Sequence, residues 1–310
     1  MDVRQLSALV AIADHGTFSA AARALFTVQS NVSSHIARLE RELGATLVDR
    51  ANGGLTEEGA RVVERARRVL NEIDDIAADM ASVDADVTGQ TRLGVIGTTA
   101  RWLMPQLLAN LAESHPHLRT VVQEGATSSL LPSVLNGDLN GAVVHLPVDD
   151  PELVIDPLFA EDLFLLAGEA HPLAQYDELT LAELDDTPLL LPPTGAALRR
   201  VLDRAAGAAG VHLTAQAEID GVRLLASLAL DGYGASIVPA TAVPTWLTGS
   251  FKRISVHGLP RRVVAFVHRR RPSPGAPTRA VLKALHETVA ANAATQPGVH
   301  TDPSPIPKPG

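Results

Sequence analysis

A run of short polar side chains between positions 29 and 34 has the residue types needed to hydrogen-bond without carrying charge. They are Gln29, Ser30, Asn31, Ser33 and Ser34. No acidic residue occurs between Phe26 and Leu39, so nothing in this stretch repels a polyanion. Amides and hydroxyls at the start of a helix are suited to DNA base edges and to phosphate oxygens. The segment therefore favours recognition of DNA.

The predicted roles within this segment differ. Gln29 can form a bidentate pair with an adenine edge, and Val32 can pack on a thymine methyl group. Phosphates, which position a helix without specifying sequence, suit four other residues: Ser30, Ser33, Ser34 and Arg38. The alternative for Gln29 and Asn31 is an ordinary solvated helix face.

Three short helices and a wing are predicted to position these side chains. The first helix runs from about Val3 to Asp14, with Asp2 as its N-cap and His15-Gly16 as its stop. The second, Phe18 to Leu25, is capped by Thr17. The third, Val28 to Leu43, ends at Gly44 and directs four apolar residues inward: Val32, Ile36, Leu39 and Leu43. Residues 46–48 and 54–56 flank a turn at Ala51-Asn52-Gly53, which is typical of a two-stranded wing. Together they predict a winged helix-turn-helix.

A long helix is predicted from Glu58 to about Ala85. Its apolar residues are spaced alternately by four and three positions: Val62, Ala66, Val69, Ile73, Ile76, Met80 and Val83. This 3.5-residue period is that of a coiled-coil seam and indicates a dimer. The alternative is an amphipathic helix that lies on its own domain.

Beyond residue 88, strands and helices alternate. Strands are expected at 91–96, 118–124, 141–146, 153–159, 162–167, 189–191, 215–219, 235–238, 251–256 and 262–268; helices are expected at 99–114, 129–136, 196–209, 222–230 and 278–291. This order predicts a parallel-rich α/β sheet with right-handed crossovers. The proline-rich tail, 293–310, is predicted to be disordered.

Composition excludes several classes of protein. The 310 residues contain no cysteine, which excludes disulfides, thiolate nucleophiles and zinc fingers. We find no signal peptide and no apolar run of membrane-spanning length, so we expect a cytoplasmic protein without a membrane partner. Net charge is -9, and the first 60 residues hold five arginines against seven acids. A DNA contact must therefore rest on local placement and on dimerisation rather than on bulk charge.

The N-terminal block resembles the LysR-type transcriptional regulators, and the likeness extends over about residues 2–292. Its strongest part is the set Leu6, Phe18, Ala21, Ala22, Leu25, Gln29, Val32, Ser33, Ile36, Leu39, Glu40, Leu43, Gly44, Leu47, Arg50, Leu55, Thr56 and Gly59. The second half adds Gly94, Pro105, Pro116, Gly137, His171-Pro172-Leu173, Gly232-Tyr233-Gly234 and Pro239. The resemblance implies a homodimer or homotetramer that binds an interrupted inverted repeat in double-stranded DNA under small-molecule control. It also implies that Arg50 lies beside the DNA backbone, and it makes RNA polymerase a further candidate partner.

Departures from that family occur at the third helix. The chain has Val28-Gln29-Ser30 where the family has Ser-Gln-Pro, and Ser34 where it has arginine. The loss of the capping hydroxyl at Val28 shifts the predicted cap to Thr27.

An effector site is predicted at the carboxyl ends of the strands in the second half. Helix N-termini after parallel strands offer free N–H groups suited to carboxylates, so we expect a small organic anion. Thr98, Thr99 and Arg101 follow the first strand, Thr127 and Ser128 follow the second, and His145 ends the third; Thr194 and Val222 occupy the matching loops of a second subdomain. The alternatives are helix capping for the two neighbouring threonines and an ordinary satisfied polar role for the histidine.

Catalytic and metal sites are not predicted. The sequence holds no G-x-S-x-G, H-E-x-x-H or Walker pattern, so we expect no enzyme and no cofactor. The rival hypothesis is a small-molecule binding protein that does not bind DNA and whose N-terminal module serves assembly; an enzyme built on the α/β part alone is weaker.

The domain boundaries follow from these elements. We expect a DNA-binding domain over 1–58, a dimerising linker helix over 59–87, and an effector domain over 88–292. Its two subdomains, like those of periplasmic binding proteins, are expected at 88–160 with 268–292, and at 161–267.

Overall fold

The N-terminal helices fold around a cluster of small and branched apolar residues. The computed structural model describes residues 1–50, 54–81 and 87–303. Helix α1 (Val3–His15) begins with a capping box in which the Asp2 carboxylate accepts from the Gln5 N–H, and it ends at Gly16 with φ of 75°. Helix α2 (Phe18–Ala24) is capped by Thr17, and helix α3 (Gln29–Leu43) follows. The predicted order of helices is confirmed.

Two details of α3 differ from the prediction. Its N-cap is Val28, without a capping side chain, whereas the Thr27 hydroxyl accepts from the Asn31 amide nitrogen at 2.9 Å. The predicted Thr27 cap is therefore wrong, because that hydroxyl bonds to a side chain instead of a backbone N–H. Leu43 is exposed rather than inward, since it is the last residue of the helix, past the core that Ile36 and Leu39 enter.

The wing consists of strands β1 (Val48–Asp49) and β2 (Gly54–Leu55), which pair antiparallel. The predicted turn at 51–53 lies outside the described residues. Gly59 shows how closely the next helix approaches the wing, because a Cβ there would stand 2.0 Å from the carbonyl oxygen of Leu47. Glycine is required at this position to let the helix pack on the strand.

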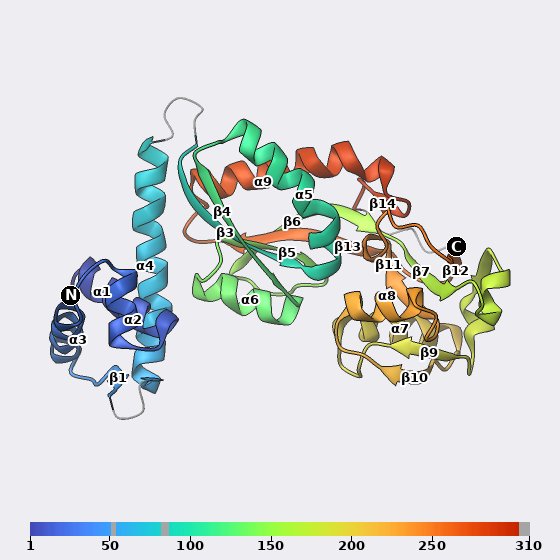
Figure 1. Cartoon of the computed structure of the whole chain (residues 1–310), viewed down its shortest axis with the longest axis horizontal. Helices are drawn as coiled ribbons and strands as arrows, with labels where there is room; N and C mark the ends of the chain where they lie inside the picture. The colour runs from blue at the N-terminus through green and yellow to red at the C-terminus, as the bar shows by residue number, and fades with distance from the viewer. Residues whose placement is uncertain (51–53, 82–86, 304–310) are drawn as a thin grey trace.

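Helix α4 (Glu57–Ala81) crosses between the N-terminal domain and the α/β region (Figure 1). Val62, the first position of the predicted seam, packs against the core of the N-terminal domain, and Ala66, the second, is buried. The next four are exposed: Val69, Ile73, Ile76 and Met80. The alternative of a helix lying on its own domain therefore holds for the first part of α4, and the coiled-coil seam stays a prediction for the exposed part. Val83 and the predicted end at Ala85 lie outside the described residues.

The first subdomain is built on a six-stranded sheet in the order β14-β6-β13-β5-β3-β4. Its strands are β3 (Gly89–Ile96), β4 (Leu118–Gly125), β5 (Gly141–His145), β6 (Leu153–Glu161), β13 (Arg262–Arg269) and β14 (Val299–His300). Its helices are α5 (Gly97–Ser114), α6 (Thr127–Asn136) and α9 (Ala276–Asn292). Strand β3 pairs in parallel with β4 and β5, so α5 and α6 begin at the same edge of the sheet.

The second subdomain lies at the other end of the molecule (Figure 1). Its sheets are β11-β7-β12-β8 and β10-β9. The strands are β7 (Leu163–Gly168), β8 (Glu178–Thr180), β9 (Pro188–Leu191), β10 (Thr214–Glu218), β11 (Ser236–Pro239) and β12 (Phe251–His257). Helices α7 (Ala197–Ala209) and α8 (Val222–Leu230) pack on them; short 3-10 turns are η1 (Pro172–Gln175), η2 (Leu181–Leu184), η3 (Ala240–Ala242) and η4 (Ala293–Thr295), the last in the C-terminal segment.

Three predictions about the α/β region are corrected. The main sheet is mixed rather than parallel-rich, because β13 runs antiparallel to both β5 and β6. That pairing also places β13 in the first subdomain, so the second ends before residue 262 and not at 267. The expected disordered tail is structured through His300: Gln296 is buried and donates to the Ala240 and Val243 carbonyls, and β14 pairs with β6. Over the part of the chain that is described, no helix is long and apolar enough to cross a membrane.

Candidate DNA-recognition edge and effector loops

The N-terminal half of α3 presents the predicted polar edge to solvent. Gln29, Ser30, Asn31 and Ser34 are exposed, and Ser33 is partly buried. Arg38 is also exposed, one turn further along the helix. The edge is uncharged up to this arginine, which suits hydrogen bonds to bases followed by one cationic contact to a phosphate.

Val32 cannot take the role predicted for it. Its side chain is completely buried in the core of the N-terminal domain, together with Ile36 and Leu39. A residue at 0% exposure offers no surface to a thymine methyl group. Its helical spacing with those two residues indicates a core position. The predicted contact between Val32 and a base is therefore wrong.

Exposed apolar side chains next to the edge were missed at the sequence level. Phe26 lies in the turn between α2 and α3, is 98% exposed and has φ of 52°, a left-handed conformation that is uncommon for a bulky residue. Leu25 and Val28 are exposed on either side of it. These residues leave apolar surface directly before Gln29.

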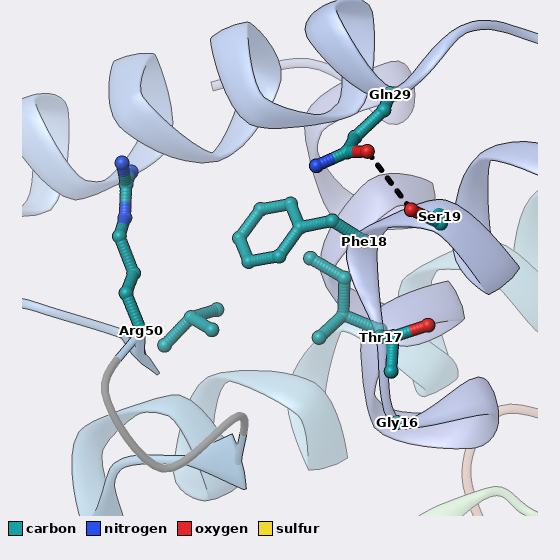
Figure 2. Close-up of a pocket in the computed structure, with 8 residues that line it drawn as sticks. Gly16, Thr17, Phe18, Ser19, Gln29 and Arg50 are labelled. Carbon is teal, nitrogen blue, oxygen red and sulfur yellow. Dashed lines mark hydrogen bonds between the residues drawn. The ribbon is translucent and has the colours of Figure 1, made fainter.

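A small cavity of about 200 Å³ lies between the start of α2, the start of α3 and the wing (Figure 2). Gln29 lines it on the side of Ser19, and its Oε1 accepts a hydrogen bond from the Ser19 hydroxyl at 2.8 Å. The opposite wall carries Arg50, whose guanidinium lies 5.9 Å from the centre of the Phe18 ring and 3.5 Å from a Glu40 carboxylate oxygen. Arg50 is therefore fixed at the entrance to the wing, on the same cavity as Gln29.

The first effector loop begins where β3 runs directly into α5. The N-cap of α5 is Ile96, and its side chain makes no capping bond, so the alternative that Thr98 and Thr99 serve as caps is not seen. Both threonines are buried. Thr98 accepts from Arg262 at 3.2 Å, whereas the buried Thr99 hydroxyl has no hydrogen-bond partner among the described residues.

A buried ion pair within the first subdomain connects this loop to the η3 turn. Arg262 and Glu161 are direct cross-strand partners on β13 and β6, and their side chains approach to 2.6 Å. Glu161 also accepts from the Thr241 hydroxyl at 2.8 Å. Sequence reasoning missed this pair because its members are 101 residues apart and carry no local motif. A buried pair of this kind fixes geometry more reliably than it adds stability.

The predicted effector residues at the ends of β4 and β5 differ in how deeply they are buried. Thr127 is partly buried with an unpartnered hydroxyl among the described residues, and Ser128 is exposed. Burial, and then the nearby Arg262 and Arg200, lower the pKa of His145 to about 4. His145 is therefore neutral at pH 7.

The second subdomain contributes residues that differ from those expected. Thr194 donates to Glu218 at 3.3 Å, and Val222 packs against the subdomain core. Arg200 on α7, which the sequence did not single out, lies close enough to His145 to affect its pKa. Arg223 on α8 pairs with Glu124 at the end of β4 at 3.1 Å, across the two subdomains.

Arg101 contacts an aromatic ring. Its guanidinium lies 4.9 Å from the centre of the Trp246 ring. Among the described residues, three other arginines contact or influence the predicted effector loops: Arg200, Arg223 and Arg262, of which the last two are paired with carboxylates. In the described ranges, no cluster of three or more histidine and acidic side chains is arranged to hold a metal ion.

Comparisons with protein-family models agree with this division of the chain. Residues 3–60 match the bacterial regulatory helix-turn-helix protein of the lysR family. Residues 84–290 match the LysR substrate binding domain.

Curated relatives extend over nearly the whole chain. The DNA-binding transcriptional dual regulator OxyR of Escherichia coli K12 is 31% identical over 303 residues, which is 94% of this chain and 95% of the relative. A probable hydrogen peroxide-inducible genes activator of Streptomyces viridosporus is 35% identical over 251 residues, or 79% and 80% of the two chains.

Solved structures share the fold. Full-length OxyR of Pseudomonas aeruginosa, a cysteine-to-aspartate variant, superposes with a TM-score of 0.78 at 22% identity, covering 100% of this chain and 99% of that one. Full-length CbnR with its target DNA gives 0.67 at 23% identity, covering 94% and 100%. The chain belongs to the LysR family of DNA-binding transcriptional regulators.

Proposed function

We propose that this regulator binds an interrupted inverted repeat as a dimer or a tetramer, with one α3 helix in the major groove of each half-site. The observation that carries this proposal is the exposed, uncharged edge of α3, with Gln29 for a base and Arg38 for a phosphate. Half-sites about one helical turn apart, or multiples of it, suit a symmetric protein.

The exposed stripe on α4 supports pairing of two chains. Val69, Ile73, Ile76 and Met80 keep the 4, 3, 4 spacing and lie open to solvent in the single chain. A contiguous apolar stripe of this kind marks a partner surface. The acidic balance of the DNA-binding domain makes such pairing necessary, because two weak half-site contacts gain affinity through effective concentration.

We propose that the effector is a small organic anion bound by the loops at the carboxyl ends of β3, β4 and β5. Arg200 supplies a charge for a carboxylate, and the Thr99 and Thr127 hydroxyls supply hydrogen bonds that described residues do not take up. Buried polar groups without partners are costly, so a ligand that satisfies them gains affinity.

The peroxide response named for several relatives is not proposed for this chain. One solved relative, a Corynebacterium glutamicum OxyR cysteine-to-serine variant bound to H2O2, is 25% identical with a TM-score of 0.61 over 95% of each chain. The present sequence contains no cysteine at any position, so thiol oxidation is chemically impossible. We further place the protein in the cytoplasm and assign it no enzymatic activity and no resident cofactor, in line with the absence of catalytic motifs from its sequence.

A footprint on the DNA upstream of its own coding region tests the proposal. Full-length protein is titrated alone, then with a panel of small carboxylates, and separately after treatment with hydrogen peroxide. We expect a protected inverted repeat whose affinity changes with one carboxylate and not with peroxide.

Two results would count against the proposal. Salt-dependent binding without sequence preference would favour the rival small-molecule binding protein. An effector response that survives both Arg200→Gln and Thr99→Val would exclude these loops as the site.

A further inference from the structure

The hydrogen bond from Ser19 to Gln29 connects two helices at the point where α3 begins. Ser19 lies in the first turn of α2, ten residues before Gln29, and both side chains are exposed. Neither residue needs this contact for packing, since neither enters the apolar core. An exposed hydrogen bond that adds little to folding can instead serve to orient a side chain.

The two ends of a glutamine amide, its oxygen and its nitrogen, have opposite hydrogen-bonding roles. Its oxygen only accepts and its nitrogen only donates, so a rotation of half a turn exchanges the two at any fixed contact. A free glutamine also samples several side-chain rotamers and meets a base edge in only some of them. The Ser19 hydroxyl donates to the oxygen at 2.8 Å and so holds the amide at one place beside the start of α3.

The amide nitrogen lies on the other side of the amide from this bond. Figure 2 shows the nitrogen on the side of the cavity occupied by the Phe18 ring, opposite the bond to Ser19. The face of an aromatic ring accepts a neighbouring N–H, and a ring edge attracts a carbonyl oxygen. Because a hydroxyl accepts as well as donates, Ser19 and Phe18 hold the amide in place in either orientation.

We propose that Ser19 is a positioning residue that holds the amide of Gln29 where it meets its base pair. The inference rests on the proposed base contact of Gln29. An adenine edge requires a donor and an acceptor in a set order, whereas a guanine edge presents two acceptors. An amide has one donor end and one acceptor end, so it can pair with adenine through two bonds and not with guanine in either orientation. Loss of the Ser19 bond lets the amide leave this position and lowers the preference for adenine.

The test uses the full-length protein and a randomised library of DNA duplexes. Wild type, Ser19→Ala, Ser19→Thr, Gln29→Ala and Thr46→Val each select their preferred sequences, and the affinity for each base at the selected positions is then titrated. Thr46→Val is the matched control, since it deletes an exposed hydroxyl of the same domain outside α2 and α3.

The expected pattern is specific to one base pair. Ser19→Ala lowers discrimination about fivefold, as for the loss of one hydrogen bond, at the base pair where Gln29→Ala also lowers it. Affinity for scrambled DNA stays unchanged. Ser19→Thr restores the wild-type preference because it retains the hydroxyl, and thermal unfolding shows that all variants are folded.

Three outcomes overturn the inference, and each is distinguishable. Wild type that selects no sequence removes the proposed function itself. Gln29→Ala with wild-type preference removes the base contact on which the inference rests. The positioning role alone is removed if Ser19→Ala keeps the full wild-type preference. It is also removed if Ser19→Ala weakens binding to every duplex equally, a result that would indicate a phosphate contact.

Discussion

Two exposed side chains of α3, Gln29 and Arg38, are expected to contribute to DNA binding in different ways. Loss of the amide in Gln29→Ala should lower preference for the matched site by about 1–3 kcal/mol, because a base contact is removed. Arg38→Ala should weaken binding to all duplexes about equally and lower the salt slope by about one, because a phosphate contact is removed. Titration of matched and scrambled duplexes at several salt concentrations measures both effects. Equal loss on both duplexes for Gln29→Ala would contradict its role.

The buried His145 should make the stability of the effector domain depend on pH. Burial and the neighbouring Arg262 lower its pKa from 6.5 to about 4, so the folded protein resists a proton that the unfolded chain accepts. The free energy of unfolding should therefore fall as pH drops from about 6.5 towards 4, by at most about 1.4 kcal/mol per pH unit from this group.

Denaturant unfolding of wild type and His145→Asn at pH 7.5, 5.5 and 4.5 isolates this contribution. All other groups titrate in both proteins, so only the difference between them matters. Wild type should lose stability relative to the variant within this window. A difference that does not vary with pH would show that His145 is readily protonated in the folded state.

The elements were largely predictable from the sequence, and the contacts between them were not. Apolar periodicity placed α3 and the order of strands because it reflects burial along one segment. It could not place β13 in the first subdomain, since Arg262 pairs with Glu161 from a distant part of the chain. The candidate site divides in the same way: Gln29 and Thr99 follow from local pattern, whereas Arg200 and Ser19 acquire their positions only from the folded arrangement. Val32 shows that a residue matching a family motif can serve the core alone.

The exposed stripe on α4 provides a prediction about assembly. Ile76→Lys places a charge in its centre and should weaken self-association by about 100-fold or more, because each of two chains loses a buried isoleucine. Asp74→Lys introduces the same side chain on an exposed position off the stripe and should leave the oligomer intact. Sedimentation at several concentrations separates monomer from dimer. Equal effects of the two variants would indicate that another surface joins the chains.

In the whole molecule, Arg67 on α4 links the DNA-binding domain to the effector domain. Its guanidinium lies 2.5 Å from Asp14 on α1 and 2.8 Å from Asp138 in the loop between α6 and β5. The same loop accepts a hydrogen bond from Asn71 of α4 at the Gly137 carbonyl. A shift of α6 on effector binding would therefore act on one arginine shared by both domains.

Coupling through this arginine is measurable as the change in DNA affinity that an effector causes. Arg67→Met keeps the aliphatic stem and removes both ion pairs, so it should reduce that change by a few-fold, within the usual 1–3 kcal/mol of an allosteric coupling. Asp138→Asn removes only the link to the effector domain and should have a similar effect, while Asp14→Asn tests the other link. Affinity for DNA without effector, and for effector without DNA, should alter little. If Arg67→Met weakened DNA binding but left the effector response intact, Arg67 would support the DNA-binding domain without transmitting the signal.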